Sequence, residues 1–591
     1  MTGYFDLLKR WCDGLLAWRV CVPEHESVRD ALLCPACGLI HGRCGDAVYP
    51  LMCVGNATGE RKYVEAAVAL QRWSDRMSRP DGSWVNDANS DWRGITVFGT
   101  IALGEALRHH GRLLDDATVD RWSSRLRQAA DFLMRYSDIR DKIINYPISA
   151  AAALAVADHI IQDERYAERA GELARIGLRH ITREGLLYGE SDPRETVTPK
   201  GCRSVDIAYN VEESLGSLAL YATLSGNSEV LGATVESLRA HLAFMLPDGA
   251  WDDSFATRSY KWTYWGSRTS DGCQVAMSLL ADHDERFAEA AWRNLQLLAA
   301  CTHEGLLHGG PHYVTHGEPP CIHHTFTHAK ALATAVDHCG RDWRPARPTA
   351  LPRDESPALQ RFEVIATHLA AVGPWRATVT EYDFPFGAHA SGGAMTLLHH
   401  AAYGPVLAAS MPQYRMIEPN NMQLVHDDTC LSLTPRVEVV AAGKTYTNVT
   451  DYTARLEHAR RDGWVTFKAA GKLTGADYRT TPRKPRHFHI TYELTDGAVA
   501  ISAGVSPIAS RDVAELVVPV VAHRGQTVRW VDGSTVEIDK PGRTLSVCTD
   551  APDGFVEHVE RRGFDPCPGL EALPLRVRLK PGQAARVVIR A

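Results

Sequence analysis

The sequence lacks the features of a membrane protein. No stretch reaches the ~18 consecutive apolar residues of a membrane span, and the N-terminus does not combine a basic region with an apolar one. We therefore expect no membrane partner and a cytoplasmic location. The alternative is a secreted chain from which a signal peptide has been removed.

Long basic runs and a dense set of cysteines are also lacking. The formal net charge is -7 and no long run of Lys or Arg occurs, which argues against nucleic acid as the main partner. Fourteen cysteines are scattered over 591 residues, too thinly for a disulfide scaffold, so we expect most of them to be reduced thiols.

The chain is long enough for two domains, and its first part is helical. From residue 1 to 345, Leu, Ala and Val recur at helical spacing. Short turns of one type separate the helices: Asp81-Gly-Ser-Trp84, Glu184-Gly-Leu-Leu-Tyr188, Asp248-Gly-Ala-Trp251 and Glu304-Gly-Leu-Leu-His308. Such degenerate repeats indicate helical hairpins, and we predict an (α/α)6-type toroid over residues 1–345 with these turns around a funnel. Alternatively, the glycines only end helices.

The second part changes character after a link rich in Pro and Arg. We expect residues 346–372 to form a linker with one short helix at 357–372. Residues 373–591 contain short β-type segments broken by Gly, Asp and Pro, which predicts an antiparallel β-sandwich. The predicted fold class is therefore α+β and multidomain, an organisation compatible with a homodimer.

The most informative stretch lies between residues 251 and 271. It contains six aromatic rings, three carboxylates and three cations. Aromatic faces stack on sugar rings, carboxylates exchange protons at a glycosidic oxygen, and Arg binds the carboxylate of a uronate. This mixture predicts an enzyme that cleaves acidic oligosaccharides or polysaccharides. Its candidate substrate-binding residues are Arg258, Trp262, Trp265 and Arg268.

A second candidate segment, Tyr209-Asn-Val-Glu-Glu-Ser214, is expected to open a helix. Asn210 suits the N-cap, and Glu213 stands three residues later in the position of a capping box, which is its alternative role. A glycosidase needs two carboxylates, one as acid and one as base or nucleophile. The candidates for this pair are Glu212, Glu213, Asp252 and Asp271.

Histidines are concentrated between residues 308 and 328, where six occur. His324 and His328 stand four residues apart on one predicted helix face, which is compatible with a metal site. No carboxylate of the HExxH type accompanies the pair, so we favour sugar recognition or proton transfer by imidazole. The candidates are His312, Tyr313, His323 and His324.

A third cluster begins with Cys34-Pro-Ala-Cys37 and continues to His41, Arg43 and Asp46. Its start is similar to a zinc knuckle, but the spacing fits no standard finger and a second ligand pair is missing. We therefore expect a loop that faces the funnel, with His41 and Arg43 as candidate substrate ligands. We predict neither a metal nor a cofactor.

Several motifs together carry a resemblance to known families: Cys34-Pro-Ala-Cys37 to Asp46, Tyr209-Asn-Val-Glu-Glu213, Lys261-Trp-Thr-Tyr-Trp-Gly-Ser-Arg-Thr-Ser-Asp271, His323-His-Thr-Phe-Thr-His328 and Ser391-Gly-Gly393. The chain resembles glycoside hydrolase family 154, whose members are β-glucuronidases. In overall plan it is also similar to heparinase II/III-type polysaccharide lyases. Both groups join a toroid to a sandwich.

The similarity to lyases implies different chemistry. A Tyr and a His would move the protons, while Asn, His or Arg would neutralise the uronate carboxylate. The residues that match are Tyr264 or Tyr313, His324 or His312, Asn210 and Arg268. The chain lacks the Asn-Asn-His-Gly type of segment that many of these lyases contain.

Three hypotheses follow, in order of preference. The first is an exo-acting β-glucuronidase that uses paired carboxylates. The second is a lyase that cleaves the same substrates by β-elimination and leaves a product that absorbs in the ultraviolet. The third is a glycan-binding protein without catalysis, which the density of titratable residues disfavours.

Overall fold

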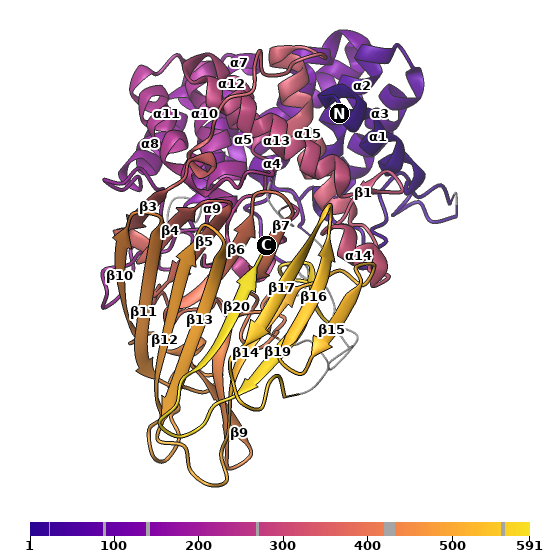
Figure 1. The fold of residues 1–591 in the computed structure, drawn as a ribbon. Helices are drawn as coiled ribbons and strands as arrows, with labels where there is room; N and C mark the ends of the chain where they lie inside the picture. Colours follow the sequence, from indigo (N-terminus) through magenta and orange to yellow (C-terminus); the bar gives the residue numbers. More distant parts are fainter. Residues whose placement is uncertain (23, 87–89, 137–141, 267–270, 419–431, 557–561) are drawn as a thin grey trace.

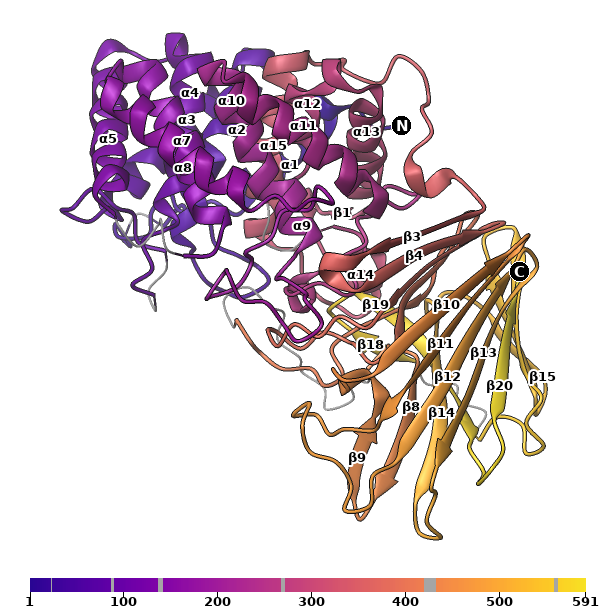
Figure 2. The ribbon, with the colours of Figure 1, turned by 90° about the vertical axis from the view of Figure 1, so that its left-hand side faces the viewer.

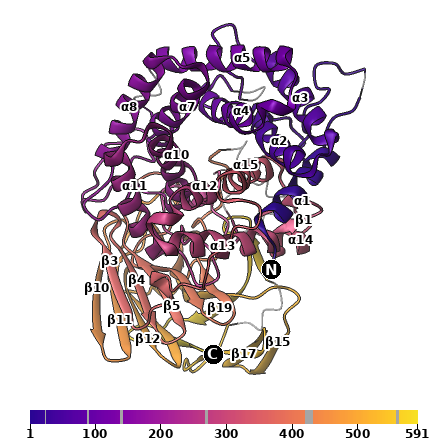
Figure 3. The same ribbon diagram turned by 90° about the horizontal axis from the view of Figure 1, so that it is seen from above.

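The helical half of the chain is a closed ring of helix pairs (Figure 3). The computed structural model describes all residues except 23, 87–89, 137–141, 267–270, 419–431 and 557–561. The inner helices are α2 (Val48–Thr58), α4 (Thr96–His110), α7 (Asn145–Ile161), α10 (Leu215–Ser225), α12 (Gln274–Leu279) and α15 (Ile322–Cys339). Their outer partners are, in the same order, α3 (Arg61–Arg76), α5 (Asp116–Arg135), α8 (Glu164–Arg179), α11 (Ser228–His241), α13 (Glu285–Ala300) and α1 (Tyr4–Ala17). Contacts of α15 with α1 and α2 close the ring.

Composition explains which helices lie inside. Helix α7 carries an Ala-rich run that is buried on every side, as expected of a helix that is apolar all round. Its outer partner α8 buries one face only and presents charged residues elsewhere. None of the helices in the described part of the chain is both long enough and apolar enough to cross a bilayer.

The recurring Gly turns are small hairpins that follow four of the outer helices. Bridges join Ser78 to Trp84 and Met245 to Trp251, and a two-stranded pair joins β1 (Thr302–His303) to β2 (Leu306–Leu307). Gly249 has a φ of 93° and would place a Cβ 2.5 Å from the backbone of Arg293, so this turn requires glycine. These glycines therefore do more than end helices, because they let each turn pack tightly against its neighbour.

The second half consists of antiparallel strands in three sheets (Figures 1 and 2). One sheet, next to the ring, has the order β3 (Ala358–Phe362), β4 (Thr367–Val372), β5 (Trp375–Thr380), β6 (Ala394–His400) and β7 (Gly404–Ala408). The largest has the order β10 (Arg455–Arg461), β11 (Trp464–Lys472), β12 (His487–Thr495), β13 (Ala498–Ser506), β20 (Ala585–Arg590), β17 (Arg543–Thr549), β16 (Thr535–Lys540) and β15 (Val528–Asp532). The third has the order β18 (Gly563–Asp565), β19 (Leu570–Arg578), β14 (Val513–Val521), β8 (Arg436–Ala441) and β9 (Lys444–Thr447). Apolar side chains from all three sheets form one core between them.

The predicted fold class, a helical toroid followed by an antiparallel sandwich, is confirmed. The prediction of a short helix at 357–372 is wrong, because this segment forms β3 and β4. Strand β4 is buried on both faces and therefore has an apolar run without alternation, a pattern that does not distinguish a strand from a helix. The exact domain boundaries, 1–345, 346–372 and 373–591, stay a prediction.

A buried ion pair links the ring to the sandwich. Asp252 follows one of the Gly turns, and its carboxylate lies 3.3 Å from the guanidinium of Arg353. The hydroxyl of Thr378 on β5 donates to the same carboxylate, and that of Ser254 donates to its other oxygen at 2.7 Å. Both charges are almost fully buried, so each depends on the other.

Arg353→Leu should lower the free energy of unfolding by about 3 kcal/mol, because it leaves the carboxylate of Asp252 buried without its cation. Denaturant unfolding followed by tryptophan fluorescence measures the change. Arg344→Leu, at an exposed position of the same link, is the control and should change stability by less than about 0.5 kcal/mol. Equal effects of the two substitutions would contradict this account of the junction.

Candidate active site

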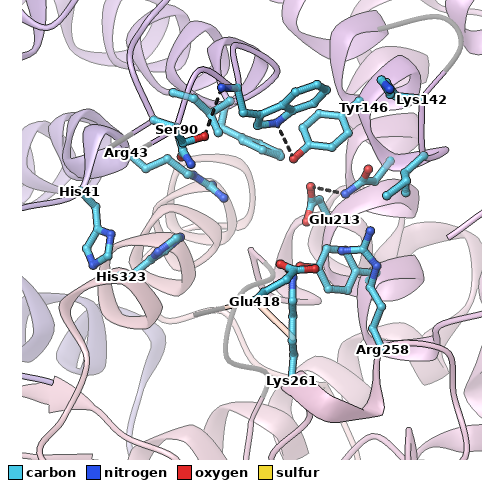
Figure 4. A pocket seen from close by; sticks show the side chains of 17 residues that line it. His41, Arg43, Ser90, Lys142, Tyr146, Glu213, Arg258, Lys261, His323 and Glu418 are labelled. Carbon is cyan, nitrogen blue, oxygen red and sulfur yellow. Dashed lines mark hydrogen bonds and ion pairs between the residues drawn. The ribbon is translucent and has the colours of Figure 1, made fainter. Parts of the chain in front are cut away.

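A cavity of about 360 Å³ lies at the ends of the inner helices, and Figure 4 shows the side chains that line it. It is lined by His41, Arg43, Asn86, Ser90, Trp92, Ile95, Phe98, Lys142, Ile143, Asn145, Tyr146, Tyr209, Glu213, Arg258, Lys261, His323 and Glu418. Glu418 is contributed by the segment that follows β7, so the second half of the chain completes the wall.

Most of these side chains stand where an inner helix begins. Asn145 and Tyr146 are the first residues of α7, His323 is the second residue of α15, and Arg43 lies in the turn of helix η1 (Gly42–Ala47) that leads into α2. The N-terminal end of a helix carries partial positive charge and unpaired N–H groups. Several such ends around one cavity favour an anionic ligand.

Tyr209 reaches the cavity from a short helical segment with unusual local geometry. It ends α9 (Ile207–Tyr209), and the next residues, Asn210–Ser214, form a π-helical turn. The side chain of Asp206 caps this start by accepting from the backbone N–H of Tyr209 at 2.9 Å. π turns are uncommon and are often found at functional sites. Here the turn leaves both Tyr209 and Glu213 lining the same cavity.

Two cations contact the Tyr209 phenol. The Nζ of Lys261 donates to its hydroxyl at 3.2 Å, and the guanidinium of Arg258 lies 4.5 Å from the ring centre. Each cation has a partner, since Arg258 lies 3.4 Å from Glu190 and Lys261 pairs with Glu418. In a buried site such cations stabilise negative charge on the phenol oxygen.

Tyr146, the other tyrosine that lines the cavity, has opposite surroundings. Its hydroxyl accepts from the indole N–H of Trp92 at 2.9 Å. Burial, together with the nearby charge of Glu213, raises the pKa of Tyr146 above its usual value of 10. Tyr146 therefore stays a neutral phenol, whereas two cations lie beside the phenol of Tyr209.

Glu213 is a neutral acid at pH 7. Burial, reinforced by the negative charge of Asp271, raises its pKa to about 8. The amide of Asn145 donates to its Oε1 at 3.1 Å and keeps the carboxyl in place. A protonated Glu213 can donate a hydrogen bond to an anionic group in the cavity and does not repel it.

Arg43 belongs to a buried network of four charges below the cavity. Its guanidinium lies 2.6 Å from Asp46 and 2.8 Å from Asp271. The ammonium of Lys330 completes the network at 3.2 Å from Asp46 and 2.7 Å from Asp271. Burial raises the pKa of Asp271, but the charges of Lys330 and Arg43 lower it below its usual value. The carboxylate therefore stays ionised.

Two imidazole rings form the wall beside Arg43. The rings of His41 and His323 lie 5.3 Å apart. Burial and the charge of Arg43 hold the pKa of His323 well below its usual range, so this ring is neutral.

The structure brings five of the predicted site residues together in the cavity: His41, Arg43, Glu213, Arg258 and His323. Glu212 and His324 are buried and do not line it. Arg268 lies outside the described residues.

The paired carboxylates of the hydrolase hypothesis do not meet in the cavity. Asp252 is bound to Arg353 at the domain junction, and Asp271 is held by Arg43 and Lys330. Neither lines the cavity, so Glu213 has no partner among the predicted candidates.

Asn210 does not cap the helix, and the capping box expected for it and Glu213 is wrong. Asp206 is the cap, because the helical segment begins at Ile207, four residues earlier than a cap at Asn210 would imply. The amide of Asn210 is directed into the protein, where its Nδ2 lies 2.8 Å from the carbonyl of Leu187 and 2.9 Å from Nε2 of His241.

The remaining predicted residues serve the junction with the sandwich. Trp262 and Tyr264 pack in an apolar cluster with side chains of β6 and β7, and Trp265 packs at its edge. His312 accepts from the backbone of Glu571 at 2.8 Å, and Tyr313 donates to the carbonyl of Pro566. Their aromatic and polar character therefore stabilises the contact between the domains.

Sequence reasoning missed Asn145, Tyr146, Tyr209, Lys261 and Glu418 as site residues. A signal was present for some of them, since polar and aromatic residues begin the otherwise apolar inner helix α7. Glu418 also had a signal, since it lies in a polar and aromatic segment that begins at Tyr414 and could be expected to approach the funnel from the side, although an interdomain contact was an equal alternative.

Three groups of side chains in the described part of the chain have the composition and spacing of metal ligands. They are Cys34, Cys37 and His41; Cys53, His110 and Asp337; and Glu105, His109 and His338. Of these residues, only His41 also lines the cavity.

A family model described as the ulvan lyase N-terminal domain matches residues 8–354, and one described as the ulvan lyase C-terminal domain matches residues 359–591. The chain is 37% identical over 584 residues to a broad-specificity ulvan lyase of Formosa agariphila, with 97% of this chain and 91% of that protein covered.

Solved structures are similar in fold at low sequence identity. Heparinase III has a TM-score of 0.53 and 11% identity, with 92% of this chain and 75% of that chain covered. A chondroitin AC lyase of Streptomyces coelicolor has a TM-score of 0.51 and 11% identity, with 99% and 82% covered.

The prediction of a glycoside hydrolase is wrong, and so is its identification as a β-glucuronidase of family 154. The sequence matches are to lyases over nearly the whole chain. The cavity agrees with this correction, since the candidate carboxylates are bound elsewhere. The overall similarity to heparinase-type lyases was the correct part of the resemblance.

Glu213 should be protonated at pH 7 and should lose its proton with a midpoint near pH 8, because burial and Asp271 disfavour its charged form. Infrared difference spectra between the unmodified chain and Glu213→Gln would show the carboxylic acid band below pH 8 and the carboxylate band above it.

Glu418→Gln is the matched control. Burial raises the pKa of Glu418, but the ion pair with Lys261 lowers it to about 2. The difference spectrum of Glu418→Gln should therefore contain no carboxylic acid band at pH 7. An ionised Glu213 at pH 7 would contradict the description of this site.

Proposed function

We propose, from the premise that the chain belongs to the ulvan lyase family, that it cleaves an acidic polysaccharide by β-elimination at a uronate residue. The relative from Formosa agariphila is named a broad-specificity ulvan lyase, and ulvan is therefore the first substrate to consider for this chain. The observation that carries the mechanism is the Tyr209 phenol held between Lys261 and Arg258.

β-Elimination has three requirements. The proton on C5 of the uronate must be removed by a base, which is difficult while the adjacent carboxylate is fully charged. The C5–H electrons then form the C4–C5 double bond as the bond from C4 to the glycosidic oxygen breaks. The leaving oxygen receives a proton from an acid. The site must supply a base, an acid and a group that neutralises the carboxylate.

Tyr209 is the base in this proposal. Lys261 donates to its oxygen and Arg258 lies over its ring, so two cations are in place to stabilise the phenolate that acts as the base. After it has taken the C5 proton, the same hydroxyl can protonate the leaving oxygen, so one residue can serve both steps.

Asn145 and Glu213 neutralise the carboxylate of the substrate. The Asn145 amide has N–H donors, and Glu213 is protonated at neutral pH, so it too can donate. Hydrogen bonds from these groups become stronger as negative charge moves from C5 onto the carboxylate, which stabilises the transition state.

The charged side chains that line the cavity also favour an acidic polysaccharide as the substrate. Arg43, Lys142, Arg258 and Lys261 line the cavity, and Glu213 and Glu418 are its only carboxylates among the described residues. With Glu213 neutral, cations exceed anions around the ligand. An acidic polysaccharide is attracted to such a site, and a neutral one is not.

The experiment is to incubate the purified chain with ulvan and, separately, with a neutral polysaccharide, while following the ultraviolet absorbance of the new C4–C5 double bond. The absorbance should rise with ulvan only. New reducing ends without a rise in absorbance would indicate hydrolysis and would contradict the proposal.

Variants of the two cavity tyrosines then test the mechanism in the same assay. Tyr209→Phe should lower kcat by about 10² or more, because it removes the base. Tyr146→Phe is the matched control and should keep kcat within about tenfold, since it removes only a hydrogen bond with Trp92. A larger loss in Tyr146→Phe than in Tyr209→Phe would reverse the assignment.

A further inference from the structure

Four potential metal ligands converge beside the cavity from two distant parts of the sequence. Cys34, Cys37 and His41 lie in the segment between α1 and α2, and their ligand atoms all lie within 4.8 Å of one another. Cys321 directly precedes α15. Its Sγ lies 3.8 Å from that of Cys34, next to the compact group of three but not part of it. The fold thus supplies the further ligand that the N-terminal segment lacks in sequence.

The N-terminal segment has the local form of a metal-binding turn. The backbone N–H of Cys34 donates to Leu39 at 2.9 Å, and that of Gly38 donates back to Cys34 at 2.8 Å. Gly38 has a φ of 67°, which allows the chain to reverse directly after Cys37. The reversal returns the chain to His41, whose Nε2 lies 3.3 Å from the Sγ of Cys37.

We propose that Cys34, Cys37, His41 and Cys321 bind one Zn²⁺ ion. Three thiolates and an imidazole form one of the common structural zinc sets. With zinc–sulfur bonds of about 2.3 Å, two thiolates on a tetrahedral ion lie about 3.8 Å apart, which is the distance between Cys34 and Cys321. With a zinc–nitrogen bond of about 2.0 Å, a sulfur and a nitrogen lie about 3.5 Å apart, close to the distance between Cys37 and His41.

The distances and the chemistry favour zinc over a disulfide between Cys34 and Cys321 and over other cations. A disulfide requires about 2.05 Å between sulfurs, far less than the separation of Cys34 and Cys321. Magnesium and calcium prefer oxygen ligands, and these four side chains offer none. A thiolate-rich set selects zinc among the common divalent cations.

The ion would hold the wall of the cavity without touching the substrate. Two residues after His41 comes Arg43, and two residues after Cys321 comes His323, and both of these line the cavity. A metal between Cys321 and the N-terminal segment would thus fix α15 and η1 relative to each other. His41 would then serve the metal and not the sugar.

Any test must distinguish this site from a second group of potential metal ligands. Glu105 and His109 lie near the end of α4, and His338 lies near the end of α15. This group is at the opposite end of the inner helices from Cys321. A metal bound there would not depend on any of the cysteines.

The test is the zinc content of the purified full-length chain after exposure to zinc sulfate and removal of free metal. We expect one equivalent that is lost in Cys34→Ser and in Cys321→Ser. Cys339→Ser changes a half-buried cysteine at the other end of α15, and Cys21→Ser changes an exposed one, and both should retain the zinc. Zinc that persists in Cys34→Ser and Cys321→Ser would overturn the proposal.

Cobalt substitution of the unmodified chain tests the ligands without relying on folded variants. Three thiolates should give a strong sulfur-to-cobalt charge-transfer band in the near ultraviolet. A folded chain that takes up no zinc, or a cobalt complex without this band, would overturn the proposal. Detection of a disulfide between Cys34 and Cys37 in the native chain would do the same.

Discussion

Four buried charges hold the inner helices together below the cavity, and the site depends on them. Arg43 and Lys330 each bind both Asp46 and Asp271, so segments that precede α2 and α12 are tied to the middle of α15. None of the four could be buried without the others. Burial raises the pKa of Glu213, and within the network Asp271 raises it further while Arg43 lowers it. The ion cluster therefore also acts on the protonation of a group that lines the cavity.

The ring brings helix beginnings to a single place, and this explains why an acidic substrate suits the site. The inner helices α7 and α10 are apolar along much of their length, and α7 begins with the polar side chains of Asn145 and Tyr146, which line the cavity. Closure of α15 on α2 gathers these first turns around one cavity. The sandwich adds Glu418, which orients Lys261 toward Tyr209. Each half of the molecule thus contributes to the position of the base.

Much of the fold could be predicted from the sequence, and less of the site. Helix α4, Thr96–His110, lies within residues 1–345, which were expected to be helical because Leu, Ala and Val recur there at helical spacing. The segment of β4 was read as helix because a buried strand loses its alternation. Arg43, Glu213 and Arg258 were found because they stand in unusual local patterns. Tyr209 was missed because Asn210 was taken as the cap.

The choice between a hydrolase and a lyase depends on which carboxylates already form ion pairs. Such pairs form only in the folded chain. In the sequence, Asp252 and Asp271 are candidate catalytic acids, but in the structure they form ion pairs with Arg353 and Lys330. The cysteines also could not be grouped from the sequence alone. Cys34 and Cys321 are 287 positions apart and become neighbours only in the closed ring.

The most direct test of this account is the structure of the Tyr209→Phe chain with an acidic tetrasaccharide bound. The account predicts a uronate in the cavity with its C5 beside the ring at position 209 and its carboxylate facing Asn145 and Glu213. A uronate whose C5 faces Tyr146 or His323 instead, with its carboxylate away from Asn145, would contradict it.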